Sequence, residues 1–328
     1  MLQKLLKQKI TEQGSISIAE YMETCLYHPE YGYYMTRDPF GKNGDFTTAP
    51  EITQLFGEML ALWIMATWQK LGSPEKFNLI ECGPGRGTLM GDILRTLKKI
   101  SPECFSASEI KLIEISPFLQ KIQQHKLAEY NIKWHNKIEK VDLTLPTILI
   151  GNELLDAFPV QQFNLNGEEK RVCLKNNELS FTHEDDVVEK SPVMDKFLTY
   201  LNDNIKNGAL LFIDYGYTKE GMNGENTGDT LQAVKSHKFM DILTNCGEAD
   251  ITTHVNFSHV QEILKTENTS IVPLATFLIG LGLPVRAADL IEKQPAKTEE
   301  IEHAVYRLLH AEQMGGLFKV LTKIYIND

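Results

Sequence analysis

Three alternate glycines at the end of an apolar run constrain this chain more than any other feature. The run Phe77–Cys82 has the length and composition of a buried strand, and Gly83, Gly85 and Gly87 follow it. Apolar residues then recur at helical spacing, at Ile93, Leu94 and Leu97. This pattern predicts a strand, a tight turn and a helix. Such a junction suits a nucleotide-like ligand, because glycine allows a close backbone approach and the start of a helix offers free N–H groups.

The glycine spacing and two neighbouring acids separate two kinds of cofactor. A dinucleotide fingerprint is G-x-G-x-x-G with a pyrophosphate on the helix, whereas this chain has G-x-G-x-G preceded by Glu81. S-adenosylmethionine has no phosphate but has an ammonium group, which an acid on the turn fits better. Glu114 ends the next predicted strand, where a carboxylate can accept hydrogen bonds from both ribose hydroxyls. The glycines alone fit a simple strand-to-helix turn nearly as well, but the two acids together favour the S-adenosylmethionine site.

The composition narrows the class of protein. The 328 residues predict one large α/β domain with an appendage. The net charge of −11 argues against a nucleic-acid partner. The five cysteines are scattered without a C-x-x-C pair, so we expect no disulfide framework, no metal site and a reducing compartment. We see no transit or signal pattern at the start of the chain and no apolar run as long as a membrane span, so we expect a soluble cytoplasmic protein without membrane insertion.

Polar residues stand where several predicted strands end. From residue 77 onward, strand-like runs alternate with helical segments, which predicts a parallel sheet with helices on both faces. In such sheets, ligands bind beyond the carboxyl ends of the strands. The polar residues at these ends are Glu81, Glu114, Asn152, Glu153 and Asp214. Their agreement predicts a binding site along one rim of the sheet.

The chain divides into an N-terminal helical region, residues 1–75, and a core, residues 76–328. The core is expected to carry a small antiparallel β insertion at about 160–183 and a helical insertion at about 256–313. A loop at about 40–51 precedes a strongly apolar helix. From its residue types alone, this loop is explained better as a helix entry than as a lid over the cofactor.

An ordered set of motifs resembles those of the MidA-type family. The motifs are residues 44–51, 56–58, 81–90, 114–117, 152–159 and 213–216. The family consists of S-adenosylmethionine-dependent methyltransferases of the class I, seven-stranded fold, and the resemblance covers about residues 14–325. It implies that the 40–51 loop is a lid after all. The cofactor site that it implies uses Glu81, Gly83, Gly85, Gly87 and Glu114. We also expect Thr48 and Pro50 of the lid, and Asn152 and Glu153 at a strand end, to contact the cofactor.

The resemblance also implies a partner. Mitochondrial members of the family resemble protein arginine methyltransferases that assist the assembly of respiratory complex I and modify its 49-kDa-type subunit. We therefore expect a protein substrate of this kind and leave a homodimer open, while the lack of a transit pattern suggests a bacterial relative. Two departures from the family pattern bear on substrate choice. They are Gln232-Ala233-Val234, after a glycine-rich loop at 218–230, and Asn256, where an aspartate is usual.

The acceptor chemistry predicts a set of catalytic residues. Methyl transfer is an in-line displacement, so the protein has to align the acceptor and remove a proton. A guanidinium has a pKa far above neutrality and pairs bidentately with carboxylates, for which Asp45, Glu153 and Asp156 are candidates. His254 is a candidate base. A hydrogen bond at a helix entry explains His254 equally well, and a turn or cap role is open for Asp156.

Two other functions compete with the arginine methyltransferase. A small-molecule O- or N-methyltransferase needs the same cofactor turn, but it would have a closed aromatic pocket instead of an acid-lined cleft. A non-catalytic assembly chaperone would retain the fold without needing the cofactor. The glycine spacing disfavours a dehydrogenase.

Overall fold

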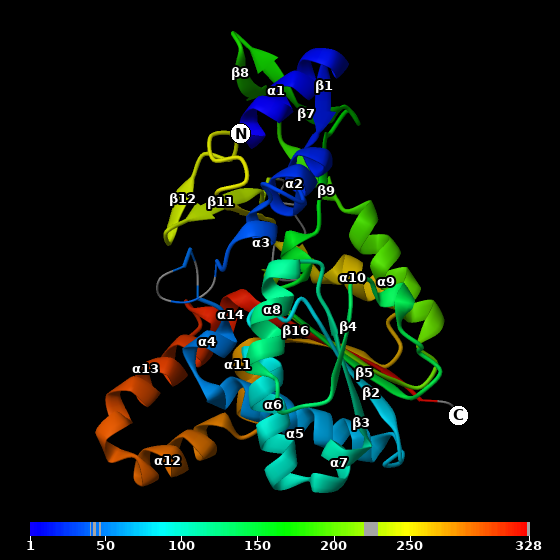
Figure 1. Cartoon of the computed structure of the whole chain (residues 1–328), viewed down its shortest axis with the longest axis vertical. Coiled ribbons are helices and arrows are strands. Elements are labelled where there is room, and N and C mark those ends of the chain that lie inside the picture. The colour runs from blue at the N-terminus through cyan, green and yellow to red at the C-terminus, as the bar shows by residue number, and fades with distance from the viewer. Residues whose placement is uncertain (40, 42–43, 46, 220–228, 327–328) are drawn as a thin grey trace.

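A computed structural model of the chain describes residues 1–39, 41, 44–45, 47–219 and 229–326. Its centre is a sheet of eight strands in the order β15-β16-β10-β5-β2-β3-β4, with β14 paired to β10 (Figure 1). These strands are β2 Phe77–Cys82, β3 Ser108–Ile113, β4 Ile132–His135, β5 Thr147–Asn152, β10 Gly208–Tyr217, β14 Val255–Asn256, β15 Thr269–Pro273 and β16 Phe318–Tyr325. Within the path of seven strands, β16 runs antiparallel to both neighbours, and the pairs among β2, β3, β4, β5 and β10 are parallel. The predicted seven-stranded α/β fold is confirmed.

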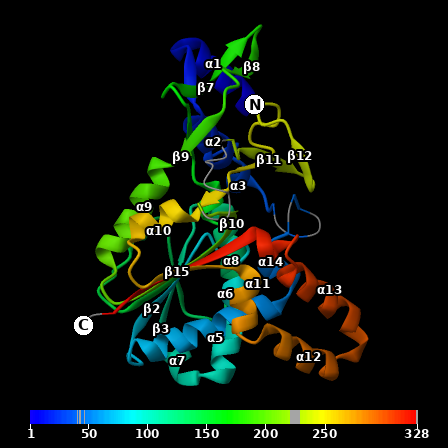
Figure 2. The same cartoon turned by 180° about the vertical axis from the view of Figure 1, so that it is seen from behind.

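Helices cover both faces of this sheet because its central strands are apolar on both sides. In β2, Phe77 and Leu79 pack on one face, and Ile80 and Cys82 pack on the other. The first face carries α5 Gln54–Lys70, α6 Thr88–Ile100, α11 Leu274–Gly280, α12 Leu283–Lys293 and α13 Thr298–Leu309. The second face carries α9 Pro192–Asn204 and α10 Phe257–Leu264, which lie side by side in Figure 2. The other helices between residues 33 and 317 are α3 Tyr33–Thr36, α4 Ala49–Ile52, α7 Pro102–Ala107, α8 Pro117–Lys126 and α14 Met314–Leu317.

A second, smaller core lies above the sheet in Figure 1. It joins α1 Leu2–Gln13 and α2 Ile18–Tyr27 to two small sheets. One sheet contains β1 Ser15–Ser17, β6 Gln161–Asn164, β7 Glu169–Lys175, β8 Glu178–Phe181 and β9 Val187–Lys190. The other contains β11 Gln232–Lys235, β12 Lys238–Met240 and β13 Asp250–Thr252. The N-terminal helices α1 and α2, the β insertion and the sheet of β11, β12 and β13 therefore pack around one core.

Several of these strands differ from the sequence predictions. The region 1–75 contains β1, which pairs with β7, and α5 from the same region packs into the main core. The span 256–313 contains β15, a strand at the end of the main sheet. Neither β1 nor the sheet of β11, β12 and β13 was predicted. The strands β1, β12 and β13 have three residues each and are too short to show an alternating pattern. The domain boundary near residue 75 stays a prediction.

Two of the predicted loops are described only in part. Residues 40, 42–43 and 46 of the predicted lid lie outside the described residues, as do residues 220–228 of the 218–230 loop. Among the described residues, no single helix is long and apolar enough to cross a membrane. By length and composition alone, α11 and α12 meet that test together, with a bend of 66° between them.

Candidate functional site

The glycine turn between β2 and α6 is shaped for close approach. Gly83, Gly85 and Gly87 have φ values of 66°, 53° and 75°, which L-residues with a side chain rarely adopt. The Gly83 N–H donates to the Ile113 carbonyl at 3.0 Å, and a Cβ at Gly83 would lie 3.0 Å from Leu154 Cδ1. The turn is therefore fixed to the neighbouring strand, and a side chain at its first glycine would be strained and crowded.

Glu81 is a buried carboxylate with an unsatisfied oxygen. Its side chain is 2% exposed, and its Oε2 has no hydrogen-bond partner among the described residues. Burial raises the pKa of Glu81 to about 8, and the charge of Glu114 adds to the shift. A cationic ligand beside Glu81 would supply the missing partner and favour the ionised carboxylate, so this position fits the ammonium group of S-adenosylmethionine.

Glu114 follows β3 and is held in a fixed orientation. Its Oε1 accepts from the Ser116 N–H at 2.8 Å, and its Oε2 accepts from Gln123 Nε2 at 3.0 Å. Gln123 Nε2 also donates to the Gly85 carbonyl at 2.7 Å, which joins Glu114 to the glycine turn. Burial raises the pKa of Glu114 to about 7. Each carboxylate oxygen keeps a second lone pair, so Glu114 can still accept from two ribose hydroxyls.

The glycine turn opens into a cavity of about 940 Å³ between the sheet and the second core. Of the residues predicted for the cofactor, those that line it are Thr48, Pro50, Glu81, Gly83, Gly85, Glu114, Asn152 and Glu153. Of the predicted catalytic residues, those that line it are Glu153, Asp156 and His254. Gly87 and Asp45 are not in its lining. Asn152 Oδ1, like Glu81 Oε2, is buried without a hydrogen-bond partner among the described residues.

Ion pairs tie the segment before α5 to the glycine turn. Arg86 Nε lies 2.7 Å from Asp38 Oδ2, and Arg86 Nη1 lies 3.2 Å from Glu51 Oε2. The Thr88 hydroxyl also donates to Glu51. This network places α4, with Pro50, over the cofactor side of the cavity. The described part of the predicted lid thus borders the cavity.

Glu153 occupies a strained position directly after β5. Its φ is 50°, unusual for a residue with a side chain, and such outliers cluster at functional sites. Its Oε1 accepts from the Ala49 N–H at 3.2 Å and from Asn152 Nδ2 at 3.1 Å. Burial, followed by the charge of Asp156, raises the pKa of Glu153 to about 8. The strained turn directs this carboxylate into the cavity.

Asp214 supports the turn that carries Asp156. The Asp214 Oδ2 accepts from the N–H groups of Leu154, Leu155 and Asp156, at 3.1, 2.9 and 3.3 Å. The Asp156 side chain is left to face the cavity, and its Oδ1 has no hydrogen-bond partner among the described residues. Burial raises the pKa of Asp156 to about 6. Asp214 therefore positions the turn and does not line the cavity.

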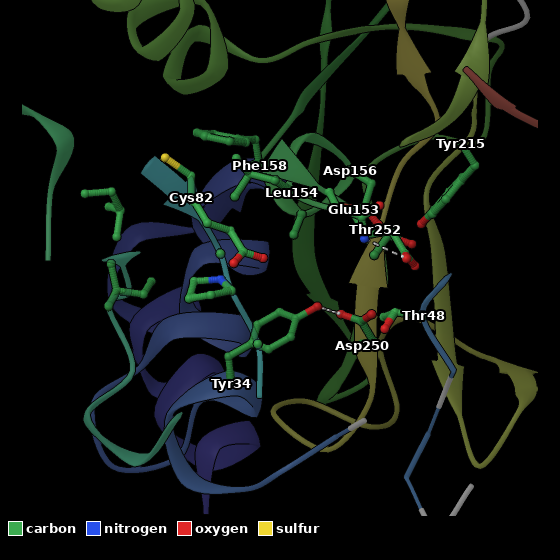
Figure 3. A pocket seen from close by; sticks show the side chains of 18 of the residues that line it. Tyr34, Thr48, Cys82, Glu153, Leu154, Asp156, Phe158, Tyr215, Asp250 and Thr252 are labelled. Atoms are coloured by element: carbon green, nitrogen blue, oxygen red, sulfur yellow. Dashed lines mark hydrogen bonds between the residues drawn. The ribbon is translucent and has the colours of Figure 1, made fainter. Parts of the chain in front are cut away.

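Asp250 is a third acid on the side of the cavity that Glu153 and Asp156 line, and no sequence pattern marked it. It begins β13, and its Oδ1 accepts from the Tyr34 hydroxyl at 2.7 Å. Burial, followed by the charge of Asp156, raises the pKa of Asp250 to about 8. Figure 3 shows Glu153, Asp156 and Asp250 on one side of the cavity, near Thr48 and Thr252. A three-residue strand carries no signal that marks its acid as functional.

The two remaining candidate catalytic residues have different surroundings. His254 lines the cavity with an exposed side chain, and its ring is nearly perpendicular to that of Tyr215, with 5.3 Å between the ring centroids. Desolvation of the imidazole lowers the pKa of His254. Asp45 instead accepts from the Tyr33 hydroxyl at 2.8 Å and from the Ser236 N–H at 2.7 Å. These bonds hold the turn between β11 and β12. The structure thus brings His254 to the cavity and gives Asp45 a supporting position outside its lining.

The two departures from the family pattern also have assigned contacts. Gln232 lines the cavity, and its Nε2 donates to Thr252 Oγ1 at 3.3 Å and to the Tyr215 hydroxyl at 3.4 Å. Asn256 caps α10, because its Oδ1 accepts from the His259 N–H at 3.2 Å. Of the two, Gln232 can contact an acceptor, and Asn256 serves the helix.

Comparison with known proteins agrees with this geometry. The family model described as "Putative S-adenosyl-L-methionine-dependent methyltransferase" matches residues 59–182 and 171–274. A crystal structure of a Burkholderia thailandensis protein bound to S-adenosyl-homocysteine superposes with a TM-score of 0.88 and 25% sequence identity. The match covers 100% of this chain and 92% of that chain.

Curated relatives match over nearly the whole chain. The Drosophila melanogaster protein named "Protein arginine methyltransferase NDUFAF7 homolog, mitochondrial" is 32% identical over 98% of this chain and 84% of its own length. The Homo sapiens protein named "Protein arginine methyltransferase NDUFAF7, mitochondrial" is 30% identical over 95% of this chain and 81% of its own length. Both are mitochondrial by name. This finding overturns our expectation of a cytoplasmic protein, which rested on the cysteine pattern and the start of the chain.

Proposed function

Because the chain belongs to this family of S-adenosyl-L-methionine-dependent methyltransferases, we propose that it methylates an arginine side chain of a protein. The chain is a methyltransferase, and its cofactor is S-adenosylmethionine. The finer proposal concerns the acceptor, which we take to be the 49-kDa-type subunit of respiratory complex I during assembly. The names of the curated relatives support the arginine acceptor.

One observation carries the arginine proposal. Three carboxylates line one side of the cavity: Asp156 and Asp250 are buried, Glu153 is partly buried, and the pKa values of Glu153, Asp156 and Asp250 are raised to about 8, 6 and 8. Buried acids of this kind are stabilised in the ionised form by a cation that donates hydrogen bonds to them. A guanidinium has five N–H donors in one plane and stays protonated in proteins. An arginine side chain therefore offers these carboxylates a permanent cation with several hydrogen-bond donors.

The residues on the cofactor side would hold S-adenosylmethionine, which supplies the electrophilic methyl group when bound. In this assignment, Glu81 pairs with the ammonium and Glu114 binds the ribose. Gly83 and Gly85 have no side chain, so the cofactor can come close to the backbone there. Thr48, Pro50 and Asn152 border the same space. The unpaired oxygens of Glu81 and Asn152 support this assignment.

On the acceptor side, Glu153 and Asp156 orient the guanidinium and accept its proton. Fixing one nitrogen toward the reacting carbon accelerates a displacement by removing rotational freedom. A carboxylate whose pKa is raised toward neutrality is also a stronger base than an ordinary one. Asp214 keeps Asp156 in place through the turn that it caps. His254 is a second candidate proton acceptor, since the lowered pKa keeps its imidazole neutral at pH 7.

Transfer of a labelled methyl group tests this proposal. The protein is incubated with methyl-tritiated S-adenosylmethionine and the purified 49-kDa-type subunit. Wild-type protein is expected to label the subunit, and Asp156→Asn is expected to reduce the rate about 100-fold. The control is Glu302→Gln, which removes an exposed carboxylate on α13 and is expected to leave the rate unchanged.

The result also separates the competing functions. Labelling of a small hydroxyl or amine compound instead of any protein would favour the small-molecule methyltransferase. Support of assembly by a Glu81→Ala protein that folds but no longer binds the cofactor would favour the chaperone. The homodimer stays a prediction.

A further inference from the structure

The sheet of β11, β12 and β13 presents one face to the cavity and the other to the second core. Ala233 and Ile251 pair across β11 and β13, and both are buried in the second core. On the opposite face, Val234 pairs with Phe239 of β12 and with Asp250 of β13. Phe239, Val234 and Asp250 all line the cavity. Successive side chains alternate between the faces of a strand, so these three form one row across the sheet.

This row changes from exposed and aromatic to buried and acidic. Phe239 is 77% exposed, Val234 is partly buried and Asp250 is 6% exposed. Neighbouring strands lie about 4.8 Å apart, so the row spans about 10 Å from its outer to its inner end. A single row thus leads from the mouth of the cavity to Asp250, one of the three acids on the proposed acceptor side.

We propose that this row, which we name the acceptor wall (Phe239, Val234 and Asp250), guides the arginine of an extended polypeptide segment into the cavity. The proposal rests on the proposed arginine methyltransferase function. The polypeptide crosses the mouth at Phe239, the methylene stem of its arginine lies along Val234, and the guanidinium reaches Asp250. Arginine suits such a path, because its stem packs on apolar surface while its charged head seeks polar partners.

One observation favours an arginine, and a second favours a polypeptide over free arginine. First, the charges are complementary, since the inner end of the wall faces the acids Glu153 and Asp156. Second, the outer end is an aromatic ring that is exposed although it borders the cavity. Exposed aromatic side chains are enriched where proteins bind other proteins. A free amino acid would fill the inner end only, whereas a polypeptide also covers the ring.

The chain offers a matched control on the same strand. Met240 follows Phe239 in β12 and pairs with Ala233, so it belongs to the opposite face of the sheet. It is 40% exposed and does not line the cavity. Met240→Ser therefore removes an exposed apolar side chain from the same strand without changing the acceptor wall.

The test uses calorimetric titration of protein saturated with S-adenosyl-homocysteine. Three probes are compared: Nα-acetyl-arginine amide, a capped Gly-Leu-Arg-Leu-Gly peptide, and the same peptide with citrulline, a neutral isostere, in place of arginine. We expect the arginine peptide to bind more tightly than the citrulline peptide. Phe239→Ser is expected to weaken the arginine peptide about tenfold and to leave Nα-acetyl-arginine amide unchanged. Asp250→Asn is expected to weaken both arginine probes, and Met240→Ser neither.

The outcomes separate this inference from the proposed function. If Asp250→Asn weakens both arginine probes but Phe239→Ser changes neither, the arginine site stands and the acceptor wall is overturned. If Phe239→Ser weakens Nα-acetyl-arginine amide as much as the peptide, Phe239 shapes the cavity itself, and its role toward a polypeptide is overturned. If neither arginine probe binds better than the citrulline peptide, the arginine methyltransferase proposal fails and the acceptor wall fails with it.

Discussion

The cofactor side and the acceptor side of the cavity are built in different ways. On the cofactor side, Glu81, the glycine turn and Glu114 come from two neighbouring parallel strands and lie within 34 residues of sequence (81–114). On the acceptor side, Asp250 meets Glu153, Asp156 and Tyr34 from three distant parts of the chain. The cofactor side is a local motif, whereas the acceptor side exists only once the second core has formed against the sheet. A variant should therefore affect one side without the other, which the following changes test.

The largest expected effect is on the cofactor side. Gly83→Ala places a Cβ at a φ of 66° and 3.0 Å from Leu154, so the turn has to move. We expect S-adenosylmethionine binding to weaken by about 100-fold, measured by calorimetry. Positive φ alone costs about 1 to 2 kcal/mol, or about 5- to 30-fold, and the crowding against Leu154 and the displaced turn add to it. The control is Gly167→Ala, which has a φ of 84° in a turn with nothing within 4 Å of its Cβ. Cofactor binding unchanged in Gly83→Ala would contradict the assignment of the turn.

A change beneath the acceptor side should lower stability and turnover together. The Asp214 Oδ2 accepts three backbone N–H groups, and Asp214→Asn replaces the carboxylate by an amide with one acceptor oxygen and an NH₂ group that cannot accept. We expect the free energy of unfolding to fall by about 2 to 3 kcal/mol, measured by urea denaturation, and kcat to fall with it. Asp186→Asn, at an exposed position, is the control. A stable Asp214→Asn protein with normal kcat would show that the capped turn does not position Asp156.

The hydroxyl that contacts Asp250 should have a smaller effect. Tyr34→Phe removes one hydrogen bond to Asp250 and keeps the ring in place. We expect about a fivefold rise in KM for the protein acceptor and no change in the dissociation constant of S-adenosylmethionine. Equal loss on both sides would mean that Tyr34 serves the cavity as a whole, and the separation of the two sides would not hold.

The smallest predicted effect is a dependence on pH. Folding raises the pKa of Glu153 from 4.5 to about 8 and that of Asp250 from 3.8 to about 8. Between about pH 5 and 8 the folded protein holds protons that the unfolded chain has lost, so these two groups make stability fall as pH rises. A bound guanidinium favours the ionised carboxylates, so binding at pH 7 should release protons. Titrations of Nα-acetyl-arginine amide in two buffers with different ionisation enthalpies measure this release, and no release would contradict the raised pKa values.

The same contrast explains what the sequence predicted. The residues of the glycine turn are consecutive in the chain: the strand, the turn and helix around Gly83, and the acid two residues before it. Their binding role could therefore be predicted without knowledge of the fold. The apolar runs likewise predicted β2, β3, β4, β5, β10 and β16 of the central sheet, whereas β14 and β15 were missed. Glu153 and Asp156 were predicted as site residues because they follow such a run directly, and both line the cavity. Local patterns were sufficient wherever the site is made from one strand end.

The remainder depends on contacts between distant segments. Asp250 stands in a strand of three residues, and only its pairing with β11 brings it to the cavity. Tyr34 lies in a tyrosine-rich segment, and the acid to which its hydroxyl donates, Asp250, is 216 residues away in sequence. Asp45 was assigned to catalysis because it lies in the predicted lid, but its hydrogen bonds go to Tyr33 and to the turn at Ser236. No pattern within one segment distinguishes these roles.

We propose that the acid-lined side of the cavity holds an arginine of a protein beside the cofactor. Mass-spectrometric mapping of the methyl group, after the protein has acted on the 49-kDa-type subunit with labelled S-adenosylmethionine, tests this most directly. We expect the label on a guanidinium nitrogen of one arginine, and its loss when that arginine is replaced by lysine. A label on a lysine, on a hydroxyl group or on no residue of the subunit would contradict it.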